Sequence, residues 1–298
     1  MSSAYDPPRA DMKLPPFEYE APSSLDEAIA LLAAGEGNAR PLAGGQSLLP
    51  MMAFRLAQPS LLVDLARIPG LDRIEATEAG LRLGALVTWR KIQEDLRVSE
   101  ACPLLAVAIK HVAHYQIRNR GTIGGSLAHA DPAAEMPTIA LTCEAVVEVI
   151  GRNGKRRIEA ADLFVGPLMT SLEADEIILA IEIPGWPRKR RWAFEEFARR
   201  RGDFALAGIA MFYDQDASGR ACNVHIGAIG AADTPIRLTA AEATLDGRAV
   251  DEAAIAAAAK AACEEIDPAG DLHGGAAYRK ALVGTLLQRA TRRAAAQP

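Results

Sequence analysis

The chain has 298 residues, of which 50% are hydrophobic and 24% charged, and its formal net charge is −5. A chain of this length can bury a large core in two or three subdomains, and its acidic balance excludes the basic surface typical of nucleic-acid binding. No apolar run approaches the roughly 18 residues of a transmembrane segment, and residues 1–8 do not resemble a signal peptide. We expect a soluble, cytoplasmic protein with no transmembrane segment and a flexible tail over residues 1–15.

The first part of the chain reads as a β-α-β unit with a further strand. Ser24 and Glu27 form a capping box that opens a helix ending at Gly35. The apolar face of this helix is spaced three or four residues apart and consists of Leu25, Ala28, Ile29 and Leu32. Short apolar runs predict strands over 17–19, 39–43 and 61–65. This unit forms the first predicted subdomain, residues 16–66.

The middle of the chain alternates hairpins and helices. Residues 74–86 alternate around Glu78-Ala79-Gly80, which predicts a hairpin, and Asn153-Gly154 predicts a second hairpin with a type I′ turn between strands 145–150 and 155–159. A further strand over 176–183 should end at Pro184. Helices are predicted over 88–95, 104–114 and 137–143. These elements form the second predicted subdomain, residues 67–187.

A basic run over 185–191 is a predicted connector to the last part of the chain. Three strands should follow, over 192–198, 206–214 and 221–229. Helical patterns then cover 239–245, 251–265 and 278–295. The third predicted subdomain therefore spans 188–298, and the fold class is α+β. We expect the first two subdomains to clasp a ligand and the third to cover its reactive end.

Two glycine-glycine segments carry the functional signal. Residues 41–50 read Pro-Leu-Ala-Gly-Gly-Gln-Ser-Leu-Leu-Pro, and residues 121–126 read Gly-Thr-Ile-Gly-Gly-Ser. Glycine lets the backbone approach a ligand closely, and successive N–H groups beside a hydroxyl can bind an anion. Neither segment is a P-loop or a G-x-G-x-x-G fingerprint. One such segment alone is typically only a turn, whereas two would suit the two phosphates of a dinucleotide.

The four cysteines indicate no metal or cluster site in this chain. They stand about forty or more residues apart, at Cys102, Cys143, Cys222 and Cys263. Iron–sulfur and structural zinc sites need closely spaced cysteines. We expect reduced, mostly buried thiols.

Taken together, the two segments resemble the FAD loops of a known family. Residues 41–50, followed by Leu-Val-Asp-Leu at 62–65, are similar to the first FAD loop of the flavin-carrying medium subunit of molybdenum hydroxylases, and residues 116–137 resemble the second loop. This family includes carbon monoxide dehydrogenase and the flavin domain of xanthine dehydrogenase. Residues 200–205 resemble the segment that carries an aromatic residue over the flavin. The similarity runs from about residue 17 to the C-terminal helix.

The resemblance implies a PCMH-type FAD-binding fold. Its expected parts are two α/β subdomains and a C-terminal subdomain with a three-stranded antiparallel sheet and helices. Segments 43–47 and 122–126 would hold the FAD pyrophosphate through backbone N–H groups and the hydroxyls of Ser47, Thr122 and Ser126. The implied cofactor-binding residues are Ala43, Gly44, Gly45, Gln46, Ser47, Leu48, Thr122, Ile123, Gly124, Gly125, Ser126, Glu135, Ile178, Leu179, Asp203 and Phe204.

Individual roles follow the same resemblance. Glu135 takes the position of an aspartate that bonds the FAD sugar chain, and Ile178 or Leu179 would pack on an FAD ring. Phe204 falls where the carbon monoxide dehydrogenase type has a tyrosine near the isoalloxazine. The family often has a lysine in the strand before the Gly-Asp turn, whereas this chain has arginines at 199–201. Arg199 or Arg200 would supply that charge or be solvated.

The implied function is that of an electron-transfer subunit of an oxidoreductase. A large molybdenum–pterin subunit would hydroxylate the substrate, and a small subunit with two [2Fe–2S] clusters would pass electrons to FAD here, for delivery to an external acceptor. No residue of this chain would be catalytic, and the assembly would be a dimer of heterotrimers. The alternatives are a stand-alone FAD oxidoreductase of the vanillyl-alcohol-oxidase type and a flavin-free assembly subunit. The absence of His and Cys from both glycine segments indicates noncovalent FAD, although His129 follows closely.

Overall fold

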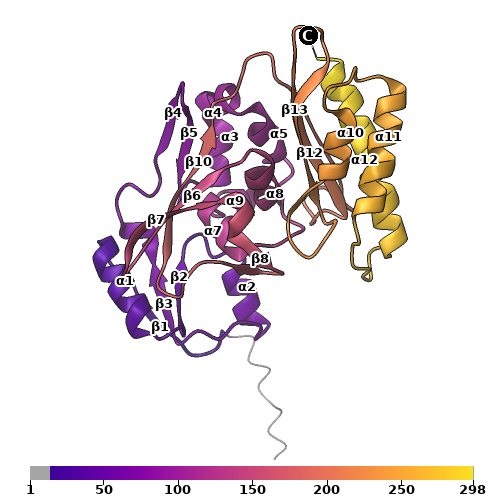
Figure 1. Cartoon of the computed structure of the whole chain (residues 1–298). Helices are drawn as coiled ribbons and strands as arrows, with labels where there is room; N and C mark the ends of the chain where they lie inside the picture. The colour runs from indigo at the N-terminus through magenta and orange to yellow at the C-terminus, as the bar shows by residue number, and fades with distance from the viewer. Residues whose placement is uncertain (1–13, 298) are drawn as a thin grey trace, which may run out of the picture.

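The computed structural model describes residues 14–297 (Figure 1). Most of the expected N-terminal tail therefore lies outside the described residues. The chain forms a small parallel sheet, a larger antiparallel sheet covered by short helices, and a C-terminal antiparallel sheet backed by long helices. This is the mixed α+β architecture that the sequence predicts. The subdomain boundaries at 66/67 and 187/188 stay a prediction.

The first sheet is parallel and holds the strands β1 (Glu18–Glu20), β2 (Ala39–Leu42) and β3 (Leu61–Asp64) in the order β1–β3–β2. Helix α1 (Leu25–Ala34) links β1 to β2, and the Ser24 hydroxyl accepts a hydrogen bond from the Glu27 N–H at 3.3 Å. The Glu27 carboxylate accepts from the N–H of Ser23 at 3.0 Å. The predicted capping box is therefore present, with its return bond shifted by one residue. Between β2 and β3 lies helix α2 (Leu48–Ala53).

The second sheet is antiparallel and has the strand order β4–β5–β10–β6–β7. Its strands are β4 (Ile74–Thr77), β5 (Gly80–Gly84), β6 (Val146–Gly151), β7 (Gly154–Glu159) and β10 (Ile177–Pro184). The helices associated with it are α3 (Trp89–Glu94), α4 (Leu96–Ala101), α5 (Pro103–Ala108), α6 (Tyr115–Arg118), α7 (Ile123–His129), α8 (Glu135–Thr142) and α9 (Ala160–Leu163). Leu83 and Val149 pack with Leu104 and Ile139 in the largest core. Leu179 of β10 instead joins the core of the first unit.

The C-terminal sheet is antiparallel, in the order β11–β12–β13–β14. Its strands are β11 (Arg191–Phe197), β12 (Ala207–Gln215), β13 (Ala221–Ile229) and β14 (Ile236–Arg237). Helices α10 (Thr239–Leu245), α11 (Glu252–Glu265) and α12 (Ala276–Ala295) lie together on the outer side of this sheet in Figure 1. Helices α5 and α8, which belong to the part of the chain before β11, contact the other face of the sheet. The sheet has the three predicted long strands plus the two-residue β14.

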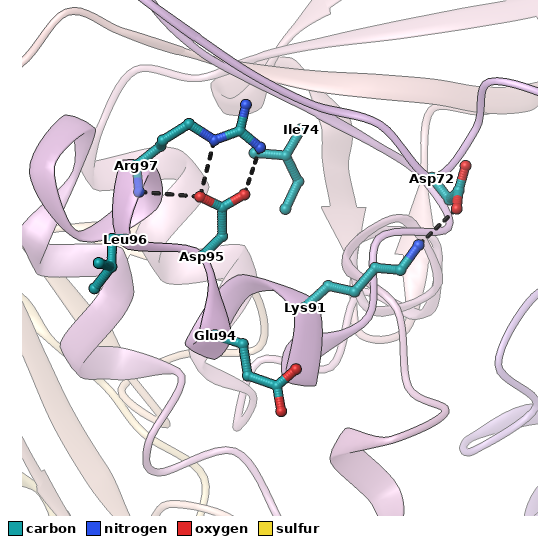
Figure 2. A pocket seen from close by; sticks show the side chains of 7 residues that line it. All are labelled: Asp72, Ile74, Lys91, Glu94, Asp95, Leu96 and Arg97. Atoms are coloured by element: carbon teal, nitrogen blue, oxygen red, sulfur yellow. Dashed lines mark hydrogen bonds and ion pairs between the residues drawn. The ribbon is translucent and has the colours of Figure 1, made fainter.

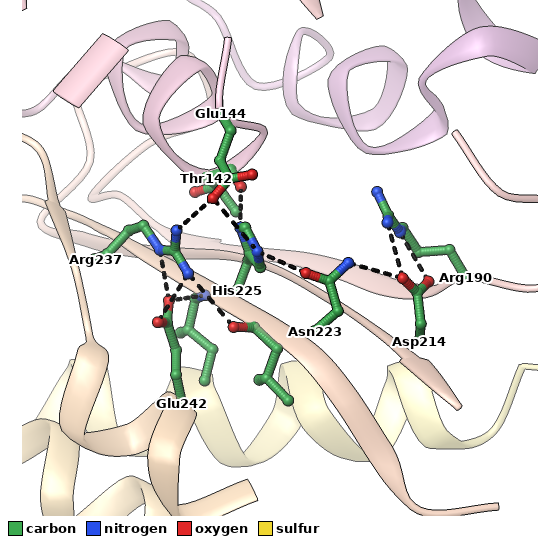
Figure 3. Close-up of polar contacts among 10 residues, drawn as sticks. Thr142, Glu144, Arg190, Asp214, Asn223, His225, Arg237 and Glu242 are labelled. Carbon is green, nitrogen blue, oxygen red and sulfur yellow. Dashed lines mark hydrogen bonds and ion pairs between the residues drawn. The ribbon is translucent and has the colours of Figure 1, made fainter. Parts of the chain in front are cut away.

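A partly buried polar cluster joins the C-terminal sheet to helix α8 (Figure 3). The His225 ring nitrogen Nδ1 lies 2.9 Å from the carbonyl oxygen of Thr142, and the ring stacks on Phe212 with centroids 4.4 Å apart. The Arg190 guanidinium lies 4.1 Å from the Phe212 centroid and bonds the Asp214 carboxylate at 2.9 Å. Burial is the main cause that lowers the pKa of His225. The buried members of this network, His225 and Thr142, are paired, and a buried polar group that is paired favours one geometry, so the contact helps to hold the sheet against α8.

The short elements are where structure and prediction differ. The helix predicted over 104–114 ends at Ala108, and residues 109–113 form turns. The elements that the sequence did not predict are α2, α4, α6, α7, α9, the 3-10 helix η1 (Leu65–Arg67) and the strands β8 (Phe164–Gly166), β9 (Met169–Thr170) and β14. The remaining predicted strands and helices are present within two residues. The β6–β7 hairpin is present, but the predicted type I′ turn is wrong, because Gly154 has a positive φ and Asn153 does not. None of the helices in residues 14–297 is both long and apolar enough to cross a membrane.

Candidate functional site

A cavity of about 1120 Å³ opens where the first sheet, helix α7 and the turn before β12 come together. This volume is slightly above the usual range of roughly 300–1,000 Å³ for small-molecule and cofactor sites, as a large cofactor would need. Most of the residues predicted from the sequence line it, although they come from distant parts of the chain. They are Ala43, Gly44, Gly45, Gln46, Ser47, Leu48, Thr122, Gly124, Gly125, Ser126, Glu135, Ile178, Asp203 and Phe204.

The first glycine segment, residues 43–48, runs from the end of β2 into α2 and forms one wall of this cavity. Gly45 has a φ of 71°, a left-handed conformation that residues with a Cβ rarely adopt. Within residues 14–297, the backbone N–H groups of Gly44, Gly45, Gln46 and Ser47 find no hydrogen-bond partner. Four successive free donors at a cavity wall can bind an anion.

The second segment, residues 121–126, has a different structure. Thr122 is the N-cap of α7, and its hydroxyl accepts from the N–H of Gly125 at 3.1 Å. The N–H groups of Ile123 and Gly124 donate to the carbonyls of Val87 and Ala85, at 3.0 and 2.9 Å. The N–H of Ser126 donates to the Thr122 carbonyl at 3.1 Å. The expectation of a second backbone cradle is therefore wrong for residues 123–126, because these donors already bond within the chain. Thr122 and Ser126 still line the cavity.

The two segments touch each other behind the cavity. A Cβ added to Gly44 would overlap the Arg120 carbonyl oxygen and lie 3.0 Å from the Gly121 Cα. A Cβ on Gly121 would lie 2.9 Å from the indole nitrogen of Trp89. The glycines here therefore let two backbones pack directly against one another.

Glu135 forms part of the cavity wall as the first residue of α8. The residue is only 7% exposed. Burial, with smaller contributions from the charges of Glu196 and Asp131, raises the pKa of Glu135 to about 8. At neutral pH the carboxyl is therefore mainly protonated, and a protonated carboxyl can both donate and accept a hydrogen bond.

Two predicted residues lie away from the cavity. Ile123 is fully buried in the largest core. Leu179 is 7% exposed and packs with the first sheet and α1. The sequence left open whether Ile178 or Leu179 faces the ligand, and the structure places Ile178 at the cavity. Ile177 also lines the cavity, and the register of β10 shifts between Ile178 and Ala180, so simple strand alternation does not set which residues line it.

The turn before β12 closes another side of the cavity. Gly202 has a φ of 89°, and a Cβ there would lie 2.6 Å from the His114 ring. Next to it, Asp203 and Phe204 line the cavity, and Phe204 is 65% exposed. Composition alone would suggest that Phe204 is a core residue. Its exposure shows that it is not.

Neither Arg199 nor Arg200 is among the described residues that line the cavity, and both are exposed. The Arg199 guanidinium lies 3.0 Å from Nδ1 of His273. The prediction that one of them supplies a positive charge near the ligand stays untested.

Sequence reasoning missed the short hairpin β8–β9. This hairpin contributes Leu168 and Thr170 to the cavity wall, and Leu168 has a left-handed φ of 55°. Leu168 is 48% exposed and the neighbouring Met169 is 58% exposed. The only signal in the sequence was an apolar pair after Gly166-Pro167, which does not distinguish a cavity rim from a core strand.

A second, shallower pocket of about 580 Å³ lies at the surface near α3 and α4 (Figure 2). Its charged groups neutralise one another. The Lys91 ammonium lies 2.6 Å from the Asp72 carboxylate, and the Arg97 guanidinium lies 2.6 Å from that of Asp95. Because these charges are already paired, the larger cavity is the candidate site.

Comparison with known proteins gives a consistent result. The family of the FAD binding domain in molybdopterin dehydrogenase matches residues 15–186, and the CO dehydrogenase flavoprotein C-terminal domain matches residues 192–294. The chain is 45% identical to the nicotine 6-hydroxylase medium subunit of Paenarthrobacter nicotinovorans, over 93% of this chain and 97% of that protein.

Solved structures agree with this. A carbon monoxide dehydrogenase structure from Hydrogenophaga pseudoflava, described as lacking the Mo-pyranopterin moiety of the molybdenum cofactor, matches with a TM-score of 0.92 and 40% identity, over 95% of this chain and 99% of that chain. Quinoline 2-oxidoreductase from Pseudomonas putida 86 matches with a TM-score of 0.90 and 40% identity, over 95% and 98% of the two chains. The chain thus belongs to the family of FAD-binding medium subunits of molybdenum hydroxylase-type oxidoreductases.

Proposed function

We propose that this chain holds FAD noncovalently in the 1120 Å³ cavity and relays electrons through it. The observation that carries the proposal is the row of four free N–H groups at 44–47, which lies on the cavity wall of a chain from an FAD-binding family. An FAD pyrophosphate is an anion of the kind that such a backbone row binds. A second row of free backbone donors is not required, because the hydroxyls of Ser47, Thr122 and Ser126 can donate further hydrogen bonds to the pyrophosphate oxygens.

The remaining wall residues suit the other parts of FAD. Glu135 would bond hydroxyl groups of the sugar chain, since its carboxyl is buried at the wall. Ile178 offers an apolar surface to a ring, and the exposed ring of Phe204 can stack near the isoalloxazine. Bound FAD supplies the redox chemistry of the subunit. The residues of this chain bind it, orient it and limit the access of solvent, and none acts as a substrate acid or base.

We further propose the partners of the family. Electrons would come from two [2Fe–2S] clusters of a small subunit and leave to an external acceptor, while a large molybdenum–pterin subunit would hydroxylate the substrate. The term "medium subunit" in the name of the nicotine relative supports a complex of unequal subunits. The relatives act on nicotine, quinoline and carbon monoxide, as their names state. We therefore assign substrate selection to the large subunit. The dimer of heterotrimers and the cytoplasmic location stay predictions.

Purification of the complex tests both parts of this proposal. We expect about one FAD per chain, released in full by acid precipitation, together with copurifying large and small subunits. An intact complex without flavin would overturn the FAD site and favour the assembly-subunit alternative. Flavin that stays with the acid pellet, and is lost in His129→Ala, would favour the covalent oxidase alternative, because His129 lines the cavity.

A further inference from the structure

The Phe204 ring is not held at the cavity by packing. It is 65% exposed, whereas Ala205 and Leu206, which follow it, are buried. A side chain with so much exposed surface makes few packing contacts. The backbone of residues 202–206 therefore decides where the ring lies, and the contacts that fix this turn become part of the site.

Close backbone contact fixes the start of turn 202–206. A Cβ added to Gly202 would lie 2.6 Å from the His114 ring and 2.8 Å from the Ala113 carbonyl oxygen. The Ala113 carbonyl also accepts a hydrogen bond from the Arg118 guanidinium at 2.7 Å. Because Ala113 lines the cavity, the start of the turn rests directly against the cavity wall.

A buried arginine holds the end of the turn. Arg279, the fourth residue of α12, is only 7% exposed, and its Nη1 atom donates to the Leu206 carbonyl at 2.7 Å. Its Nη2 atom donates to the Asp271 carboxylate, also at 2.7 Å. A Cβ on Gly230 would lie 3.0 Å from the Leu206 carbonyl oxygen and 3.3 Å from Nη1 of Arg279, so glycine lets these groups meet. The Gly230 N–H donates to the Pro132 carbonyl at 3.0 Å, which ties the same place to the loop before α8.

Packing alone would not favour an arginine at this position. A buried guanidinium loses its hydration, and within residues 14–297 the Nε atom of Arg279 has no hydrogen-bond partner. An apolar side chain of similar size would avoid this cost. What the guanidinium adds is a planar fork, whose nitrogens bond two groups in a fixed relative geometry. One of these groups belongs to turn 202–206, so the arginine fixes a position as well as filling a volume.

The second group, the Asp271 carboxylate, is itself oriented. Its Oδ1 atom accepts from the N–H groups of His273 and Gly274 at 2.8 and 3.0 Å, while its Oδ2 atom accepts from Arg279. A hydrogen bond between a guanidinium and a carboxylate is about twice as strong as one between neutral groups. Asp271 thus holds the guanidinium in the orientation that reaches the Leu206 carbonyl.

We propose that Arg279 is a positioning residue of the flavin site: its bond to the Leu206 carbonyl fixes turn 202–206 and thereby holds the Phe204 ring beside the isoalloxazine. Arg279 is not among the described residues that line the cavity, so it acts through Phe204. The inference rests on the proposed FAD site and adds to it a residue of α12, the last helix of the chain.

The test compares variants of the purified complex with FAD bound, by the visible absorption and circular dichroism of the flavin. Arg279→Met keeps an unbranched side chain and removes both hydrogen bonds, so the turn and its ring should move relative to the flavin. We expect both spectra to change in the same direction as in Phe204→Ala. The rate at which benzoquinone reoxidises the dithionite-reduced flavin should change several-fold. FAD content should equal that of the wild type, because segment 43–48 is not altered.

The double variant with Arg279→Met and Phe204→Ala shows whether Arg279 acts through Phe204. If it does, the two effects are not additive, and the double variant should have the spectra and the reoxidation rate of Phe204→Ala alone. Arg292→Met is the matched control. Arg292 also lies on α12 and bonds a carboxylate, that of Glu252 at 2.7 Å, but within residues 14–297 it bonds no residue of the turn. This variant should keep wild-type values.

Asp271→Asn is a milder second variant. Because Oδ1 accepts two N–H groups, the new amide nitrogen would take the place of Oδ2 and face the Arg279 guanidinium, which is also a donor. We expect the same changes as in Arg279→Met, but smaller. Thermal melting checks that each variant folds, and Asp271→Asn decides the question if Arg279→Met does not fold.

The outcomes separate the two proposals. A folded Arg279→Met with wild-type spectra and reoxidation rate would overturn the positioning role and leave the FAD site intact. A double variant that differs from Phe204→Ala would overturn it too, because Arg279 would then act by another route. If neither Phe204→Ala nor Arg279→Met changes the bound flavin, the inference fails while FAD binding stands. A wild-type complex without FAD would overturn the proposed function itself.

Discussion

The two glycine segments have similar sequences and different structures. Segment 43–48 leaves a row of backbone donors free, with Gly45 in a left-handed conformation. Segment 121–126 is the capped start of helix α7, and the N–H groups of residues 123–126 bond within the chain. The comparison shows that a Gly-Gly-hydroxyl pattern does not itself define an anion site. The bonds that the neighbouring residues make decide which donors stay free.

The side chains just before the two glycine pairs explain the difference, since a hydroxyl precedes Gly124-Gly125 by two residues and none precedes Gly44-Gly45 at that place. Thr122 has an extended backbone and a hydroxyl that bonds the N–H three residues on, which is the usual role of an N-cap. Ala43 has no such side chain, so nothing in the chain bonds the donors that follow it. The two segments should therefore respond differently to the same kind of substitution.

The largest effect should come from Gly44→Ala. The added Cβ would meet the carbonyl oxygen of Arg120, a backbone atom that cannot rotate away. We expect a loss of about 3 kcal/mol in the free energy of unfolding, the upper part of the usual range for overpacking, together with loss of FAD. Thermal melting and the flavin-to-protein ratio measure the two effects. Wild-type values of both would show that the two segments are not in contact.

Gly45→Val should remove FAD and leave most of the fold. A left-handed residue with a Cβ costs about 1–2 kcal/mol, and the nearest atom, Leu49 Cδ1 at 3.0 Å, belongs to a side chain that can move. The branched side chain would crowd the free donors on either side. The flavin-to-protein ratio of the purified variant measures the effect.

Gly154→Val is the matched control for Gly45→Val. Gly154 also has a left-handed φ, of 93°, and a Cβ there would meet nothing within 4 Å. It lies in the β6–β7 turn and does not line the cavity. We expect a similar loss of stability with full FAD content. If both variants lose FAD, then the loss in Gly45→Val is caused by lower stability and not by damage to the binding segment.

Gly125→Ala should have a smaller effect than Gly45→Val. Gly125 has no left-handed φ, so its backbone conformation does not block a substitution. The added Cβ would lie 2.9 Å from the Thr122 hydroxyl and disturb the cap, which costs about 1 kcal/mol. FAD affinity, measured by titration, should fall only several-fold. Complete loss of FAD from a folded Gly125→Ala would mean that the second segment binds phosphate as directly as the first.

The sequence predicted the long elements well because each carries a local signal. The Ser24 cap, the Asn153-Gly154 turn and the apolar faces of α11 and α12 all act within a few residues. Helix α7 was missed because it begins with two poor helix formers, Gly124 and Gly125, and is held by its cap and by bonds to distant carbonyls. Helix α2 contains Pro50 in its first turn, which is tolerated there but reads as a loop in the sequence.

Most of the predicted site residues line one cavity. Physical reasoning from the residues alone could not have selected them, and the family resemblance located the segments that contain them. The sequence could not show which N–H groups are free and which are bonded. The carbonyls of Val87 and Ala85, which accept from the N–H groups of Ile123 and Gly124, are distant along the chain.

The smallest effect on stability, and the most specific effect on the flavin, should come from Phe204→Ala. Phe204 is 65% exposed, so its removal should change the free energy of unfolding by no more than about 0.5 kcal/mol. The lost aromatic contact is worth about 1 kcal/mol, and we expect a changed flavin absorption spectrum and reoxidation rate.

Phe197→Ala is the control, because Phe197 is also exposed, at 39%, but does not line the cavity. Stopped-flow measurements should show that substrate still reduces the molybdenum centre in both variants, since we assign that chemistry to another subunit. A normal flavin spectrum and reoxidation rate with a clearly lower melting temperature would show instead that Phe204 serves only in packing.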